Sequence, residues 1–501
     1  MWVAIAIPCL ASVAAEQPDD RYNVLFISVD DLNDWIGPMD GNSQALTPNL
    51  DRFADEGAMV FHNAHCPGPV CGPSRSAILS GFMPNRSGIY TNRDHMLDAE
   101  LVELHPTLPE YFSMHGYVTV SKGKIFHAHM VDDGMDYGQW AFENWEPRAD
   151  GDEPDPARLT SRNRNLFHGK PLTGDVGKAE GSEFAWGPTL DPLEETEDYQ
   201  VAQWARAQLE RKWNRPFFMA IGLFRPHLPF FVPQEFFDLY PIDEIELPPH
   251  RLDDLDDILN SHGEPKFGQT ADFRWVNQRP EIFRSAVQAY LACTTYADTC
   301  LGVILDALDS SEYRDNTIVV IWGDHGWHLG EKLRFRKATL WRESTRVPFL
   351  IRLPSMESQL DNDHPVNLID LYRTLIDLCD LPPNDTIDGH SLFPLLQDPE
   401  SRVRDASLTI WQENQVSIQT DRWHYIRYAD GSEELYDVRS DPYEFKNLIH
   451  VSSKDHGRLL RRLRSYLPQE MAAPMNGERK PPKWGVISPT VGRDRWFTAE
   501  P

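Results

Sequence analysis

The stretch Cys71–Arg75 (CGPSR), followed by Leu79-Ser80-Gly81, brings chemically capable residue types close together. Cys71 is a candidate nucleophile or oxidisable side chain, because the thiolate is the reactive form of cysteine. The residues after it predict a helix start, where backbone N–H groups and the Arg75 guanidinium would meet a bound anion. A phosphatase-like thiol would need a glycine-rich phosphate loop, which Pro73 disfavours. A buried cysteine before a helix is the other alternative.

Two pairs of metal-binding side chains each follow an apolar, β-rich run. Asp30 and Asp31 come directly after YNVLFISV, and Asp324 and His325 follow TIVVIW and a glycine. Adjacent buried acids need a cation or a proton to be tolerated. Oxygen-rich ligation suits a hard ion, so we expect Ca²⁺ first and Mg²⁺ second, with His325 as a borderline ligand. Taken alone, Asp30 and Asp31 would fit a solvated loop pair.

Four basic side chains follow predicted strands in a similar way. Lys124 and His127 come after YVTVS, His227 after PFFMAIGL, and Lys337 in a basic run beyond TIVVIW. Each has a simpler alternative: His127 and His129 could be a chance pair or half of a zinc site, and Lys337 one solvated cation among several. Because ligands of wound sheets bind beyond the carboxyl ends of strands, the sheet would bring these side chains together.

Strands alternate with helices over most of the chain, which predicts a wound α/β sheet. The predicted strands are Tyr22–Val29, Tyr117–Ser121, Pro216–Leu223 and Thr317–Trp322. One predicted helix begins at Pro48, directly after Thr47. Further helices are predicted over Ser74–Ser80, about Glu194–Lys212 and about Glu281–Leu308. Later the pattern becomes short antiparallel strands and one helix: Ser407–Trp411, Gln415–Thr420, His424–Tyr428, Glu434–Tyr436 and a helix near His456–Tyr466.

Length and charge limit the possible functions. The 501 residues suffice for one large catalytic α/β domain (20–400) and a smaller α+β subdomain with an irregular tail (401–501). The polar segment 145–185 is expected to be an insertion over the site. A net charge of −29 argues against nucleic acid as a partner, because phosphate binding needs a basic surface.

Residues 1–15 are apolar and end in small residues, which predicts a signal peptide and export to the periplasm or the exterior. A short buried N-terminal segment is the alternative. No other segment is expected to span a membrane. The cysteines are too few for a disulfide scaffold, and Cys293 and Cys300 on one predicted helix are expected to be buried thiols rather than a bridge.

In this order, the motifs resemble the type I, formylglycine-dependent sulfatases of the alkaline-phosphatase-like superfamily. The resemblance runs from Asn23 to about Leu448 and includes the Cys-x-Pro-Ser-Arg signature at 71–75. It implies a sandwich with a large central mixed sheet flanked by helices, plus a smaller C-terminal subdomain with an antiparallel sheet. Three details are most similar to iduronate-2-sulfatases: Gly-Lys-x-x-His at 123–127, Pro-His-x-Pro-Phe at 226–230 and Asp-His-Gly-Trp-x-Leu-Gly-Glu at 324–331.

The resemblance also implies roles. Cys71 would be oxidised by a formylglycine-generating or sulfatase-maturing enzyme, and one hydroxyl of the hydrated aldehyde would bind the metal and attack sulfur. The metal ligands would be Asp30, Asp31, Asp324, His325 and position 71 itself. Arg75 would orient the diol, and His127 would be its base. Lys124 and Lys337 would neutralise sulfate oxygens, and His227 or Lys337 would protonate the leaving oxygen.

The implied substrate is a sulfated saccharide, in particular the 2-O-sulfate of a terminal uronic acid. Choline sulfate, phosphonates and phosphodiesters are alternatives, because the same aldehyde chemistry serves related hydrolases. An unmatured chain that only binds glycans is a further alternative.

Overall fold

The computed structural model describes residues 21–127, 141–146, 184–451 and 454–475. The predicted signal peptide, His129 and most of the predicted insertion lie outside these ranges. The predicted domain boundaries at 20 and 400 stay predictions.

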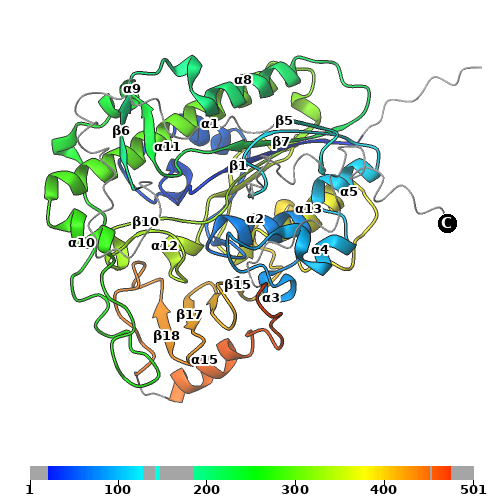
Figure 1. The fold of residues 1–501 in the computed structure, drawn as a ribbon. Helices are drawn as coiled ribbons and strands as arrows, with labels where there is room; N and C mark the ends of the chain where they lie inside the picture. The colour runs from blue at the N-terminus through cyan, green and yellow to red at the C-terminus, as the bar shows by residue number, and fades with distance from the viewer. Residues whose placement is uncertain (1–20, 128–140, 147–183, 452–453, 476–501) are drawn as a thin grey trace, which may run out of the picture.

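An eight-stranded sheet forms the centre of the molecule (Figure 1). Its middle strand β1 (Asn23–Val29) pairs in parallel with β7 (Phe217–Leu223) and β9 (Thr317–Gly323). Val29 lies opposite both Leu223 and Gly323, so the three strands end at the same level. The outer strands are β4 (Val118–Gly123) and β5 (Asn144–Glu146) on one side, and β12 (Phe349–Arg352), β2 (Met59–Phe61) and β13 (Leu360–Asn362) on the other. Since β12 runs antiparallel to β9 and β2, the sheet is mixed.

Helices cover both faces of this sheet (Figure 1). Leu25 and Ile27 of β1 pack in the core beneath α1 (Pro48–Asp55), α8 (Glu197–Leu209) and α11 (Pro280–Asp309). Val24 and Phe26 point to the other face, beneath α2 (Cys71–Ser80), α5 (Leu108–Met114) and α13 (Asp370–Leu378). Because side chains alternate along a strand, burial on both faces explains why β1 is a continuous apolar run.

Shorter elements fill the connections. The short helices are α3 (Pro84–Ser87), α4 (Glu100–Leu104), α9 (Gln234–Asp238), α10 (Ala271–Asn277), α12 (Arg342–Thr345) and α14 (Phe393–Gln397). The two-stranded pairs are β3 (Ala64–His65) with β14 (Val366–Asn367), β6 (Trp186–Thr189) with β8 (Phe230–Pro233), and β10 (His328–Leu329) with β11 (Phe335–Arg336).

The C-terminal part forms a second, antiparallel sheet with its own small core. Its strands are β15 (Ser407–Ile410), β16 (Val416–Gln419), β17 (Trp423–Arg427) and β18 (Glu433–Asp437), and α15 (Lys454–Arg464) lies beside them in Figure 1. We call the part from β15 to α15 the C-terminal subdomain. The predicted α/β fold with a mixed central sheet and an antiparallel C-terminal sheet is confirmed.

The helix α11 differs from expectation in one respect. By length and composition it could cross a bilayer, although no such segment was expected beyond residue 15; 78% of its apolar window is buried inside the protein. Cys293 and Cys300 lie on it as buried free thiols. The apolar character of α11 therefore serves the core.

Candidate active site

The ends of β1 and β9 place the four predicted metal ligands together. Asp30 and Asp31 follow β1, Asp324 and His325 follow β9, and all four are fully buried. Asp31 adopts a left-handed backbone conformation (φ 60°), which lets its N–H donate to Asp324 Oδ1 at 3.1 Å. The two strand ends are thus tied to each other. We call these four residues the acidic cluster.

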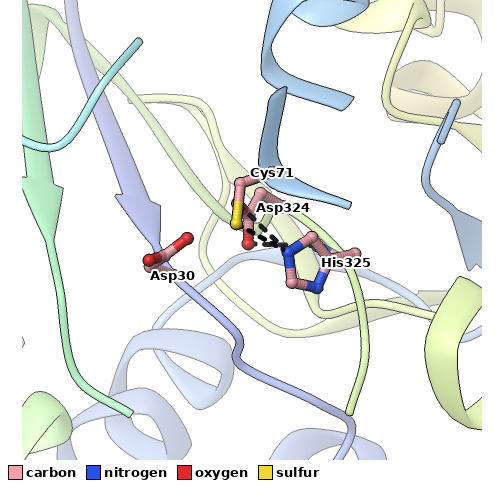
Figure 2. A group of neighbouring side chains, drawn as sticks. All are labelled: Asp30, Cys71, Asp324 and His325. Atoms are coloured by element: carbon pink, nitrogen blue, oxygen red, sulfur yellow. Dashed lines mark hydrogen bonds and ion pairs between the residues drawn. The ribbon is translucent and has the colours of Figure 1, made fainter. Parts of the chain in front are cut away.

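Cys71, the first residue of α2, points into the acidic cluster (Figure 2). Its Sγ lies 3.2 Å from His325 Nε2 and 4.0 Å from Asp31 Oδ1. Possible ligand atoms of Asp30, Cys71, Asp324 and His325 all lie within 4.8 Å of one another. The structure therefore brings position 71 and the acidic cluster to one point.

Two lysines reach the same point from different elements. Lys337 Nζ lies 2.9 Å from Cys71 Sγ and 2.5 Å from Asp31 Oδ1. Lys124 Nζ lies 3.8 Å from Cys71 Sγ and also contacts Asp30 Oδ2. Both ammonium groups thus face the side chain at position 71.

Two histidines complete the surroundings. His227 Nε2 lies 3.8 Å from Asp31 Oδ2, and Nδ1 lies 2.5 Å from the Leu228 carbonyl oxygen. His127 hydrogen-bonds to the Cys71 side chain, and burial lowers the pKa of its imidazole. His127 and His227 thus join the two lysines and the acidic cluster around position 71.

Arg75 lies one turn along α2 from Cys71, with its guanidinium wholly buried. Nε donates to Asp324 Oδ2 at 2.7 Å, and Nη2 to Asp30 Oδ1 at 3.3 Å. Nη1 donates to the carbonyl oxygens of Lys124 and Ile125 at 2.6 and 2.9 Å. The protein thus engages all three guanidinium nitrogens, and the expected contact of Arg75 with a bound anion stays a prediction. Arg75 also holds the carboxylates that surround position 71.

The charges give position 71 a positive electrostatic environment. Burial would raise the pKa of the Cys71 thiol, but Lys124, Lys337 and His325 lower it well below its ordinary value. Burial would likewise lower the pKa of His325, yet Asp324 raises it to about 9. The site thus stabilises an anion at position 71.

Sequence comparisons decide the family. The profile described as Sulfatase matches residues 22–381. The chain belongs to the sulfatase family. It is an enzyme of the class that hydrolyses sulfate esters. A second profile, described as N-sulphoglucosamine sulphohydrolase, C-terminal, matches residues 323–472 of this sulfatase.

Two relatives cover most of the sulfatase. A protein named Sulfatase from Formosa agariphila is 38% identical over 443 residues, which cover 85% of this chain and 83% of the relative. Iduronate 2-sulfatase of Mus musculus is 31% identical, with 91% of this chain and 96% of the relative covered.

Solved structures share the fold. One described as a 2-O GAG sulfatase has a TM-score of 0.65 at 23% identity, covering 89% of this chain and 91% of its own. Phosphonate monoester hydrolase of Agrobacterium radiobacter has a TM-score of 0.67 at 21% identity, covering 89% and 96%. The same fold therefore occurs in proteins named for sulfate and for phosphonate chemistry.

The acidic cluster fits a hard divalent cation. It offers three carboxylates and one imidazole, and Asp31 Oδ2 is buried without a hydrogen-bond partner among the described residues. Lysine ammonium groups contact two of these carboxylates, which shows that the cluster attracts positive charge. This donor set suits Ca²⁺ better than a soft metal.

Sequence reasoning missed several supporting residues. Asn92 Oδ1 accepts from Gly72 N at 2.8 Å, beside Cys71, and Tyr290 donates to the Asp31 carbonyl oxygen at 2.8 Å. Ser74, within the recognised signature, donates to the Asp324 carbonyl oxygen at 2.5 Å. No pattern around Asn92 or Tyr290 marks them, because each acts across a long sequence separation.

Proposed function

We propose that this sulfatase removes O-sulfate from a sulfated carbohydrate, and specifically the 2-O-sulfate of a terminal uronic acid. The support for the substrate is the similarity to iduronate 2-sulfatase of Mus musculus, which extends over 91% of this chain. A relative named Delta 4,5-hexuronate-2-O-sulfatase from Bacteroides thetaiotaomicron is 28% identical over 87% of the chain. Both relatives are named as 2-sulfatases of a uronic acid.

The observation that carries the proposed chemistry is the convergence of Lys124, Lys337 and the acidic cluster on Cys71 Sγ. Once Cys71 is converted to formylglycine, its hydrate would supply the oxygen nucleophile, and Ca²⁺ held by the acidic cluster would supply positive charge beside it.

Lys124 and Lys337 bind and stabilise the sulfate group. Their Nζ atoms approach Cys71 Sγ to 3.8 and 2.9 Å, so a sulfur atom attacked from position 71 would have its oxygens between two ammonium groups. Fixed positive charge of this kind stabilises the charge that shifts onto those oxygens in the transition state.

His227 is placed to protonate the leaving sugar oxygen. Its Nδ1 lies against the Leu228 carbonyl oxygen, so Nδ1 carries hydrogen and Nε2 faces the acidic cluster. The side chain is 19% exposed, which leaves Nε2 within reach of a substrate. A proton at Nε2 can then pass to the departing oxygen as general acid catalysis requires.

His127 and Arg75 act on position 71 itself. His127 hydrogen-bonds to the Cys71 side chain, and its lowered pKa keeps the imidazole neutral and able to accept a proton. Arg75 orients Asp30 and Asp324 from beneath. His127 is thus the base, and Arg75 a positioning residue.

A substrate panel tests the proposal with the matured enzyme. Rates are compared on a disaccharide with a terminal 2-O-sulfated uronate, choline sulfate, an aryl sulfate and an aryl phosphodiester. We expect the sulfated uronate to have the highest kcat/KM. A higher value for choline sulfate or the phosphodiester would contradict the proposed substrate, and no turnover of any sulfate ester would contradict the proposed chemistry.

A further inference from the structure

The residue Lys337 is carried by a strained hairpin. We call residues 328–341 the lysine hairpin; it contains β10 and β11, and Lys337 follows β11 directly. Four of its non-glycine residues have φ between 52° and 77°, the left-handed region that disfavours L-amino acids: Lys332, Leu333, Arg336 and Ala338. Such conformations persist only where surrounding contacts hold them. Contacts outside the hairpin must therefore stabilise it.

The C-terminal subdomain supplies two of these contacts, through Glu434 and Glu444. Trp341 Nε1 donates to Glu434 Oε2 at 2.9 Å, and both residues are 1% exposed. At the tip, Lys332 Nζ donates to the Glu444 carbonyl oxygen and, at 3.0 Å, to Asp254 Oδ1. The hairpin is thus held at its tip and at its C-terminal end.

Glu434 is the central acceptor in this contact. Besides Trp341, it accepts from Tyr428 Oη at 2.5 Å and from Tyr436 Oη, so three neutral donors converge on one buried carboxylate. The Arg334 guanidinium stacks on the Trp341 ring 4.5 Å from its centroid. A charged acceptor makes stronger hydrogen bonds than a neutral one, so the charge of Glu434 fixes the position of the indole.

The hairpin is also joined to the segment that precedes Cys71. Ala338 N donates to the Pro69 carbonyl oxygen at 3.1 Å, next to Lys337 in sequence. Within the hairpin, His328 Nε2 and Thr339 Oγ1 lie 2.8 Å apart. A displacement of Trp341 would therefore change the distance between Lys337 and position 71.

We propose that Glu434 is a positioning residue for the sulfatase reaction: through Trp341 it holds the lysine hairpin so that Lys337 reaches position 71. The C-terminal subdomain then supports the catalytic apparatus through the lysine hairpin. The inference rests on the role proposed above for Lys337.

The chain offers a matched pair of variants. Glu434→Gln removes the charge that faces Trp341. Glu433→Gln makes the same change on the other face of β18, where Glu433 accepts from Arg464 Nε at 2.8 Å. Trp341→Phe provides a second variant, since it removes the indole N–H and keeps an aromatic ring.

Steady-state kinetics test whether Glu434 acts through Lys337. We expect Glu434→Gln and Trp341→Phe to lower kcat/KM by about tenfold, and Glu433→Gln by less than about twofold. In a Lys337→Ala background, Glu434→Gln should change kcat/KM by less than about twofold, because the lysine it positions is gone. An equal loss in both backgrounds would overturn the proposal.

Hydrogen exchange by mass spectrometry provides a readout that needs no activity. Glu434→Gln should raise exchange in peptides from 328–341 while β1 and β9 stay protected as in the parent protein. Unchanged exchange in the hairpin would overturn the proposal whatever the kinetics show. If the parent enzyme hydrolyses no sulfate ester, the proposed function fails, and the exchange result still decides whether Glu434 holds the hairpin.

Discussion

Replacing Lys124 by methionine tests the electrostatic part of the account. The change removes the ammonium group and keeps most of the aliphatic stem. Lys124 Nζ lies 3.8 Å from Cys71 Sγ, and we take this as the distance between the ammonium group and an anion held at position 71. Two unit charges at that distance attract each other by about 4 kcal/mol at an effective dielectric constant of about 20. The side chain is only 10% exposed, so water screens this attraction little.

The expected loss divides between binding and chemistry. A sulfate ester is already charged in the ground state, so we assign about half of the 4 kcal/mol, about 2 kcal/mol, to the transition state alone. Lys124→Met should then lower kcat about 30-fold and raise KM by a similar factor, for a fall of about 10³-fold in kcat/KM. The assay is initial rates on the sulfated uronate disaccharide with the matured enzyme and saturating Ca²⁺.

Lys122→Met is the matched control. Lys122 lies two residues earlier, on β4, and pairs at 2.7 Å with Glu146, whose side chain is 51% exposed. Its removal should leave kcat/KM within about twofold, because exposed ion pairs contribute little. Values for Lys124→Met that lie as close to the parent enzyme as the control would refute the electrostatic role of Lys124.

Three further predictions concern the nucleophile, the metal and pH. Cys71→Ser should accept one sulfate and then stop, seen as one covalent sulfate by intact mass; repeated turnover would contradict the aldehyde mechanism. Chelation should abolish activity, and Ca²⁺ should restore it better than Mg²⁺; unchanged activity in the metal-free protein would exclude the proposed cation. Burial raises the pKa of Glu331 from 4.5 to about 7, so the folded protein binds the extra proton between these values and loses stability as pH rises through them. Glu331→Gln should therefore raise the free energy of unfolding at pH 8 by on the order of 2 kcal/mol and leave it nearly unchanged at pH 4.5, measured by urea unfolding; equal effects at both pH values would refute this explanation.

The sequence predicted the central sheet because its strands are buried on both faces. β1, β7 and β9 are continuous apolar runs, and the side chains that follow them must lie at one edge of the sheet. Asp30, Asp31, Asp324 and His325 could therefore be brought together from their positions after strands. Cys71 and Arg75 stood out through their spacing.

Other parts of the site depend on contacts that leave no local pattern. The direction of the Arg75 guanidinium follows from partners on β1, directly after β9 and directly after β4, which only the folded chain brings together. The strands of the lysine hairpin are two residues long, too short for a periodic signal. Lys337 was thus only one candidate cation in a basic run until the family resemblance gave it a role, and Glu434 was found through the structure alone.

The most direct test of the account is the chemical state of residue 71 in active enzyme. Trypsin releases residues 53–75 as one peptide that contains both Cys66 and Cys71, so Cys66 serves as an internal control. Cys66 is buried, and burial raises the pKa of its thiol, so we expect it to remain unmodified. Fragment mass spectra should show loss of sulfur and gain of an aldehyde oxygen at residue 71, with an intact thiol at residue 66. An intact thiol at residue 71 in protein that turns over sulfate esters would contradict the central claim.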